Sequence, residues 1–223
     1  MRSRTFIFGA GDLARVLLFY MQQDGFEPEG FVVDDAWCRE ESFCKLPLIP
    51  FSRMEEQFPA ENYSTYVAIG YGGMNAGRRD AFRRLRAMDY ETPNYIHHSV
   101  LNGSNAVGEG NLIFPGVVLD AYTEIGDCNV FYPSVLIAHD CKIGSFNFFA
   151  PRSALAGDIT VGNRCFFGVN CTVKNGLRIS DRCLIGAAAF VTANLEEASV
   201  LAAPKSVLLE KNSETIIEKV MKK

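Results

Sequence analysis

The chain has 223 residues, of which 48% are hydrophobic and 22% charged, a composition typical of a globular protein. A formal net charge of −4, with no extended run of lysines and arginines, disfavours nucleic acid or an acidic membrane surface as a partner. No apolar run approaches the ~18 residues that a membrane-spanning helix needs. The first residues lack a signal-peptide pattern, so we expect a cytoplasmic protein whose seven cysteines, with no C-x-x-C pair, are reduced.

Residues 1–93 are predicted to form a small Rossmann-like α/β domain, because β-rich runs alternate with helical ones. Strands are expected at residues 5–8, 30–35 and 65–70, and helices at residues 13–23 and 75–88. The second helix contains the densest basic stretch of the chain, residues 78–86, which we interpret as a solvated helix face.

A glycine turn joins the first predicted strand to the first helix. It reads Gly9-Ala10-Gly11-Asp12-Leu13-Ala14, so alanine stands where a G-x-G-x-x-G dinucleotide fingerprint has its third glycine. A helix N-terminus that follows a parallel strand can bind a phosphate, which predicts a site for NAD or for a smaller nucleotide. The alternative is a tight turn without a ligand.

Two further segments are expected at the same edge of the sheet. The acids Asp34 and Asp35 end the second strand, where a group that contacts a ribose or base would fall, although a solvated strand end is the alternative. Residues 47–50 and the loop 71–74 also border this face. The candidate nucleotide-binding residues are Gly9, Ala10, Gly11, Asp12, Leu13, Asp34, Asp35, Gly70 and Tyr71.

A strict period of six begins at Leu101. Every sixth residue from Leu101 to Val191 is apolar, in 16 consecutive positions, and the series ends at Glu197. This period fits neither a helix nor an alternating strand, and predicts a left-handed parallel β-helix in which three hexads make one coil. A glycine often follows the apolar residue, and we interpret these glycines as the corner residues: Gly108, Gly126, Gly144, Gly162, Gly168 and Gly186.

Residues 18 apart should stack inside the β-helix, which places Phe131, Phe149 and Phe167 in one column. A second inward position is expected to hold small core residues, with thiols that are not metal ligands, at Cys141, Cys165, Cys171 and Cys183. The β-helix is assigned to residues 94–200 and a C-terminal tail to residues 201–223. Within this tail, residues 213–223 are predicted to form a short capping helix.

Six segments carry a resemblance to a known family. They are Phe8-Gly9-Ala10-Gly11, Val33-Asp34-Asp35, Ala68-Ile69-Gly70-Tyr71, Tyr95-Ile96-His97-His98-Ser99, residues 137–144 and residues 156–162. In these segments and in domain order, the chain resembles the sugar acyltransferases of the sialic-acid O-acetyltransferase and bacillosamine N-acetyltransferase group. The resemblance implies a homotrimer with active sites at subunit interfaces, acetyl-CoA along the β-helix and a nucleotide-linked sugar in the N-terminal domain.

The same resemblance implies roles for individual residues. His139 would be the catalytic base, Asp140 the acid that orients it, and Gly157 the donor of a backbone N–H to the acyl carbonyl. The acyl donor would lie beside Gly157, Phe148, Ala187 and Lys205. Phe148 stands where relatives often carry a second histidine, and Ala202-Ala203-Pro204-Lys205-Ser206 replaces the usual closing G-x-P-A-K.

The residue types fit this chemistry. His139 lies two positions after the inward Ile137 and should therefore point away from the core. An imidazole titrates near neutrality and can take a proton from an attacking nucleophile, while a neighbouring carboxylate fixes its tautomer. A backbone N–H can stabilise the oxyanion. We therefore expect N-acetylation of a nucleotide-linked amino sugar by acetyl-CoA, without a metal.

Several alternatives stay open. O-acetylation of a sugar hydroxyl would use the same base and donor site, and a non-catalytic β-helix scaffold would need neither. A catalytic zinc site on three imidazoles is disfavoured, because His97 and His98 are adjacent and precede the coils that carry His139. His97 or His98 either lines the sugar site or packs the domain junction.

Overall fold

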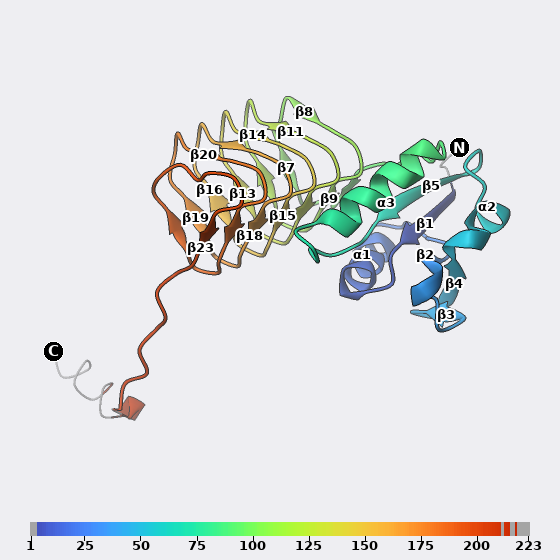
Figure 1. The fold of residues 1–223 in the computed structure, drawn as a ribbon, viewed down its shortest axis with the longest axis horizontal. Helices are drawn as coiled ribbons and strands as arrows, with labels where there is room; N and C mark the ends of the chain where they lie inside the picture. The colour runs from blue at the N-terminus through green and yellow to red at the C-terminus, as the bar shows by residue number, and fades with distance from the viewer. Residues whose placement is uncertain (1–3, 211, 215–216, 218–223) are drawn as a thin grey trace.

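The computed structural model describes residues 4–210, 212–214 and 217. Figure 1 shows an N-terminal α/β domain beside a β-helix, and a C-terminal segment that leaves the last coil in an extended path. Most of the predicted capping helix, residues 213–223, lies outside the described residues. Among the helices that are described, none is long and apolar enough to cross a membrane.

The N-terminal domain is built on a five-stranded sheet with the order β3-β4-β2-β1-β5. The three predicted strands are confirmed as β1 (Arg4–Phe8), β2 (Phe31–Val33) and β5 (Tyr63–Val67), which pair in parallel. The two predicted helices are confirmed as α1 (Asp12–Gln23) and α3 (Ala76–Ala87). Short elements complete the domain: η1 (Asp35–Trp37), β3 (Ser42–Phe43), η2 (Phe51–Arg53) and α2 (Met54–Gln57).

Two strands of this sheet, β3 and β4, were not predicted. Strand β4 (Leu46–Pro50) lies parallel to β2, with Leu48 opposite Phe31. Pro47 and Pro50 of β4 have no backbone N–H to donate to a neighbouring strand, so this segment lacks the sequence pattern of a central strand. The short antiparallel β3 is the only further strand on that side, which places β4 near the sheet edge where prolines are tolerated.

Three parallel sheets with two-residue strands form the β-helix, as the period of six predicts. Sheet 1 contains β6 (Tyr95–Ile96), β9 (Leu112–Ile113), β12 (Val130–Phe131), β15 (Phe148–Phe149), β18 (Phe166–Phe167), β21 (Leu184–Ile185) and β23 (Val200–Leu201). Sheet 2 contains β7 (Leu101–Asn102), β10 (Val118–Leu119), β13 (Leu136–Ile137), β16 (Ala154–Leu155), β19 (Thr172–Val173) and β22 (Phe190–Val191). Sheet 3 contains β8 (Ala106–Val107), β11 (Glu124–Ile125), β14 (Lys142–Ile143), β17 (Thr160–Val161) and β20 (Arg178–Ile179).

The interior of the β-helix confirms the predicted columns. The rings of Phe131 and Phe149 stack at a centroid distance of 4.7 Å, and those of Phe149 and Phe167 at 4.6 Å. The four cysteines of the second inward position are buried in the same core. They act as small apolar residues that fill the space beside the large rings.

The first member of the repeat is misplaced in the prediction. Leu101 is 68% exposed, whereas Val100 packs against the core. The reason is a register shift: Leu101 pairs with Val118 and Asn102 with Leu119, one residue off the spacing of the later coils. A shift by one residue turns the side chains of a strand to the opposite face.

The corners also differ from the prediction. The six glycines that follow the inward residues have no positive φ. The left-handed residues stand two positions later, at every sixth residue from 110 to 188, and only three of them are glycine. The predicted corner glycines are needed for close approach between coils instead: a Cβ on Gly144 would lie 2.5 Å from the carbonyl oxygen of Gly162.

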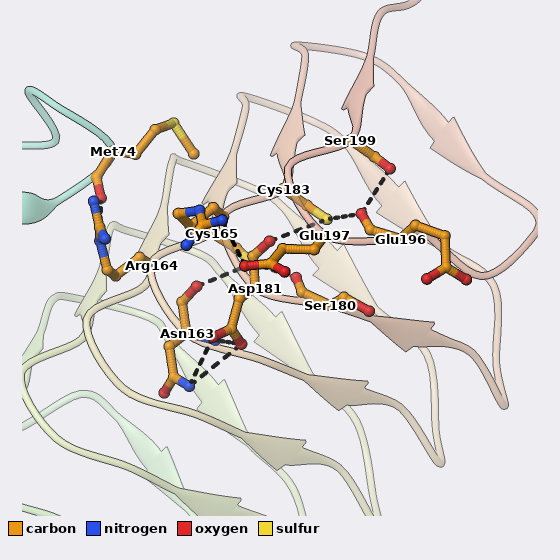
Figure 2. A network of polar contacts seen from close by, with 11 residues as sticks. Met74, Asn163, Arg164, Cys165, Ser180, Asp181, Cys183, Glu196, Glu197 and Ser199 are labelled. Carbon is orange, nitrogen blue, oxygen red and sulfur yellow. Dashed lines mark hydrogen bonds and ion pairs between the residues drawn. The ribbon is translucent and has the colours of Figure 1, made fainter.

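Side-chain ladders join successive coils. The side-chain oxygens of Asn111 and Asn129 accept the backbone N–H groups of Asn129 and Asn147, each at 2.8 Å, so the buried polar groups are paired. A second ladder runs through Asp127, Ser145, Asn163 and Asp181. Figure 2 shows its C-terminal end, where the backbone N–H of Asn163 donates to Asp181 at 2.8 Å.

A buried arginine joins the two domains. Arg78 was predicted to be solvated, but its side chain is fully buried against sheet 1. Its guanidinium donates to five backbone carbonyls, of Ile69 and Gly70 after β5 and of Cys128, Phe146 and Asn147 in the β-helix. Burial lowers its pKa to about 10, which still leaves the group charged at neutral pH. Each domain therefore supplies acceptors to one cation.

We predict that Arg78→Met lowers the free energy of unfolding by about 3 kcal/mol or more, because carbonyls would be left without a donor away from water. Urea unfolding followed by circular dichroism measures this change. Arg79→Ala, on the same helix, removes a side chain that pairs only with its neighbour Asp80 and should cost less than about 1 kcal/mol. Equal costs for the two variants would contradict a special role for Arg78.

Candidate active site

A cavity of about 680 Å³ lies where the carboxyl ends of β1, β2 and β5 face sheet 1. Its size is typical of small-molecule sites. Its walls are formed by Phe8, Gly9, Ala10, Gly11, Asp12, Leu13, Val33, Asp34, Trp37, Ala68, Ile69, Gly70, Tyr71, Gly72, Gly77, Tyr132 and Phe148. The structure thus brings together every predicted nucleotide-binding residue except Asp35.

The glycine turn shapes one wall of this cavity. Gly9 has φ of +123°, and a Cβ there would lie 2.5 Å from the carbonyl oxygen of Ala68, so only glycine fits. Gly11 has no such steric requirement and forms the N-cap of α1 without a side-chain hydrogen bond. The uncapped N–H groups of the first turn and the positive end of the helix dipole are therefore available at the cavity.

The two acids of the predicted pair are separated by the structure. Asp34 lines the cavity, and its Oδ1 accepts from Nη2 of Arg84 at 2.5 Å. The Arg84 guanidinium itself lies 3.9 Å from the ring centroid of Phe51. Asp35 lies outside the cavity wall, where its Oδ1 accepts the backbone N–H of Ser52 at 2.9 Å, and this bond lowers its pKa. Asp35 thus belongs to a local turn.

Two aromatic residues of the cavity wall, Trp37 and Tyr132, were not predicted as site residues. Trp37, two residues after Asp35, is the only tryptophan of the chain, and its 70% exposure makes its ring available for stacking. Phe148, which is predicted to lie beside the acyl donor, also lines the cavity, where its ring lies 5.0 Å from that of Tyr71 and 5.2 Å from that of Tyr132 between centroids. For Tyr132 and Phe148 the sequence did carry a signal: each is adjacent to another aromatic residue, Phe131 or Phe149, that points into the β-helix core.

His139 lies on the edge between sheets 2 and 3 and its side chain is 60% exposed, which confirms that it points away from the core. Its Nδ1 is 2.8 Å from Oδ2 of Asp140. Because a carboxylate can only accept a hydrogen bond, Nδ1 carries the proton and donates it to this contact, and the lone pair of Nε2 is available.

Gly157 stands one coil further, directly against this imidazole. A Cβ at Gly157 would lie 2.6 Å from both Cε1 and Nε2 of His139, so a larger residue would displace the ring. The backbone N–H of Gly157 donates to no acceptor in the part of the chain that the structure describes, whereas the next N–H, of Asp158, donates to the carbonyl of His139 at 3.0 Å. An available proton acceptor and an available N–H donor therefore lie side by side.

Acidic groups surround the imidazole. The hydrogen bond that His139 donates to Asp140 raises the pKa of His139 above its ordinary value of 6.5, and the negative charges of Asp140, Asp120 and Asp158 act in the same direction. The result is a more basic Nε2, suited to taking a proton from a nucleophile near neutral pH.

Within one chain, the histidine and the cavity are not brought together. His139 and Gly157 lie on the edge between sheets 2 and 3, whereas the cavity faces sheet 1. Ala187 is exposed on the edge between sheets 1 and 2, and Lys205 is exposed beyond β23. Of the predicted acyl-donor residues, only Gly157 contacts His139.

The other two histidines lie at the domain junction and do not line the cavity. His97 is buried with its ring 5.5 Å from that of Tyr20, and Nδ1 of His98 is 2.5 Å from Oδ1 of Asp24. These contacts favour the packing alternative. His139 is not part of this group, so the three imidazoles do not converge within the chain.

Residues 158–193 match a family described as the hexapeptide repeat of succinyl-transferase. A comparison with curated protein sequences finds no match. The crystal structure of PerB from Caulobacter crescentus, in complex with CoA and GDP-perosamine, is 27% identical with a TM-score of 0.79, over 90% of this chain and 94% of that chain. A histidine-to-alanine variant of the same GDP-perosamine N-acetyltransferase, also with CoA and GDP-perosamine, gives 26% identity and a TM-score of 0.80 over 90% and 93%.

The chain shares the fold of these N-acetyltransferase structures over 90% of its length, and part of its β-helix matches the hexapeptide-repeat family. The acetyltransferase domain of PglB from Neisseria gonorrhoeae has the same fold, with 19% identity, a TM-score of 0.79, and coverage of 89% of this chain and 96% of that domain. The shared architecture includes both the α/β domain and the β-helix of this hexapeptide-repeat protein.

We predict that Asp140→Asn lowers the pKa of His139, because the variant loses the carboxylate that stabilises the imidazolium. The wild-type imidazole should titrate above pH 6.5 and the variant imidazole at lower pH, measured by the NMR chemical shift of the His139 Cε1 proton. Asp89→Asn is the control: it removes a carboxylate of the N-terminal domain that does not act on His139, and it should leave this pKa unchanged. An unchanged pKa in Asp140→Asn would contradict the ion pair.

Proposed function

We propose that this protein transfers the acetyl group of acetyl-CoA to the amine of a nucleotide-linked amino sugar. The observation that carries the proposal is the arrangement at one corner of the β-helix: His139 with an available Nε2, Asp140 on Nδ1, and the unpaired N–H of Gly157 beside the ring. Acyl transfer from a thioester needs these two functions, a base and an oxyanion donor.

The cavity supplies the binding site for the acceptor in this proposal. The first turn of α1 offers N–H groups to a diphosphate, Asp34 offers a carboxylate to a ribose or base, and Trp37 offers a ring for stacking. The sugar then extends toward Tyr132 and Phe148. PerB, the relative bound to CoA and GDP-perosamine, supports a nucleotide-linked sugar as the ligand class.

The reaction follows from the groups at the corner. The neutral amine of the sugar attacks the thioester carbon, and Nε2 of His139 takes the proton that the nitrogen loses. The carbonyl oxygen becomes an oxyanion, which accepts a hydrogen bond from the N–H of Gly157. The intermediate then collapses to the amide, and CoA leaves with the proton that the imidazolium returns. Asp140 holds the imidazole in one tautomer throughout.

The outer faces of the β-helix support the predicted homotrimer. Sheet 2 presents mostly apolar side chains, at Leu101, Val118, Leu136, Ala154, Thr172 and Phe190. Sheet 3 presents mainly polar ones, at Ala106, Glu124, Lys142, Thr160 and Arg178. An exposed apolar face of this kind is typical of a subunit contact, so we place sheet 2 toward the threefold axis.

Threefold symmetry would complete the site. If sheet 2 faces an axis parallel to the β-helix, the edge that carries His139 lies against the next subunit's edge between sheets 1 and 2. Rotation about that axis preserves height, and His139 lies along the chain between Tyr132 and Phe148, two residues of the cavity wall from successive coils. The base of one subunit would thus reach the cavity of the next. Ala187, on the facing edge, would line the groove for the acyl donor, and Lys205 is proposed to contact the same donor.

Acetyl-CoA consumption with a panel of nucleotide-linked 3-amino and 4-amino sugars tests the proposed reaction. We predict release of CoA thiol with at least one amino sugar, and none when its amine is replaced by a hydroxyl. Thiol release with hydroxyl acceptors alone would contradict N-acetylation. If the protein bound neither CoA nor any nucleotide, the proposal that it is an enzyme would be wrong.

Replacement of the base tests the mechanism. We predict that His139→Ala lowers kcat by about 10²–10⁴-fold, the usual contribution of a general base, while the affinity for the nucleotide-linked sugar stays within a few-fold. Circular dichroism checks that the variant is folded, which its exposed position favours. If a folded His139→Ala protein kept the wild-type turnover, His139 would not be the catalytic base.

A charge in the proposed trimer contact tests the assembly. We predict that Leu136→Glu, on the apolar face of sheet 2, shifts the protein from trimer toward monomer in analytical ultracentrifugation, because it would bury an unpaired carboxylate. Lys142→Glu reverses a charge on the polar face of sheet 3 and should leave the trimer intact. A trimer unaffected by Leu136→Glu would place the contact elsewhere.

A further inference from the structure

Three titratable side chains meet at the junction between the domains, outside the site described above. Asp24 follows the last residue of α1, and His97 and His98 lie between β6 and β7. One ligand atom from each lies within 4.8 Å of the other two. Oδ1 of Asp24 is 2.5 Å from Nδ1 of His98 and 3.9 Å from Nε2 of His97.

The carboxylate of this cluster is buried without a permanent cation. The Asp24 side chain is only 8% exposed, and no lysine or arginine forms an ion pair with it among the described residues. Its other partner is the neutral hydroxyl of Tyr95, which donates to Oδ2 at 2.8 Å. Buried carboxylates are normally paired with a fixed positive charge or a metal ion, so this one has an unfilled electrostatic requirement.

The surrounding residues hold the cluster in the way that outer-shell groups hold metal ligands. Tyr95 fixes Oδ2 of Asp24 and leaves Oδ1 toward the histidines. Oγ of Ser99 lies 2.8 Å from Nδ1 of His97 and also accepts the backbone N–H of Gly116 at 3.0 Å. A metal-binding histidine usually has such a partner on its second nitrogen.

We propose that Asp24, His97 and His98 form a binding site for a divalent transition-metal ion of the zinc class. Oδ1 of Asp24, Nε2 of His97 and Nδ1 of His98 would be its three protein ligands, a nitrogen and oxygen set that suits Zn²⁺. In a tetrahedral site with bonds of ~2.1 Å, ligand atoms lie roughly 3.4 Å apart, between the two separations observed here. Because His98 is 72% exposed, its ring can move outward to that spacing.

Binding selects one tautomer of His97. The backbone N–H of Ser99 also points at Nδ1, at 3.2 Å, so the metal-free imidazole accepts there and carries its proton on Nε2. In the metal-bound form the proton moves to Nδ1 and is donated to Oγ of Ser99, which frees the lone pair of Nε2. The bound ion would connect the end of α1 to the start of the β-helix, and so has a structural role separate from the acetyl-transfer site.

Isothermal titration of the full chain with ZnCl₂, after dialysis against EDTA, tests the proposal. We expect one ion per chain, a rise in melting temperature on addition of Zn²⁺, and an affinity at least ~10-fold weaker in His98→Ala, which loses a ligand from an exposed position. Asp24→Asn keeps the shape of the side chain and should weaken binding similarly.

His139→Ala is the matched control, because it removes the third histidine of the chain and should leave zinc affinity unchanged. The proposal is overturned if wild-type protein binds no zinc, if His98→Ala binds zinc as tightly as wild type, or if binding is lost only in His139→Ala. None of these readouts depends on acetyl transfer.

Discussion

The buried guanidinium of Arg78 fixes how the two halves of this molecule face each other. It binds the carbonyls of Ile69 and Gly70, which belong to the cavity wall, and carbonyls in two successive coils of the β-helix. Because one rigid cation holds both sets of acceptors, the strand ends of the α/β domain keep a constant distance from Tyr132 and Phe148. Together with the apolar cluster that α1 and sheet 1 share, this junction holds the two walls of the cavity in place.

The 18-residue coil also determines which groups lie side by side at the proposed catalytic corner. It places Gly157 directly against His139, so the repeat itself sets a backbone N–H beside an imidazole. The same repeat makes residue 140 a left-handed corner with φ of +59°, which brings the Asp140 carboxylate back to Nδ1 of its neighbour. A base, its orienting acid and an oxyanion donor thus arise from two adjacent coils without any added loop.

Features that depend on periodicity could be predicted from the sequence, whereas the positions of single residues that depart from a local pattern could not. The period of six predicted the β-helix, its phenylalanine column and the outward His139, since each follows from the spacing alone. Arg78 was misjudged because nothing local distinguishes it from the other arginines of α3, and its three acceptors in the β-helix lie 50 to 69 residues further along the chain. The sequence could not separate Asp34 from Asp35, because the chain leaves β2 at Val33 and turns into η1 at Asp35, and only the fold shows which of the two acids lines the cavity.

The central claim is that each active site combines the His139 of one subunit with the cavity of the next. Mixing His139→Ala with Ala10→Phe, which fills the cavity, tests it directly, because each variant alone should be inactive. After joint denaturation and refolding at equal amounts, random trimers should recover about one quarter of wild-type activity, since one interface in four pairs an intact cavity with an intact histidine. No recovery from correctly assembled mixed trimers would contradict the claim and place base and cavity in the same subunit.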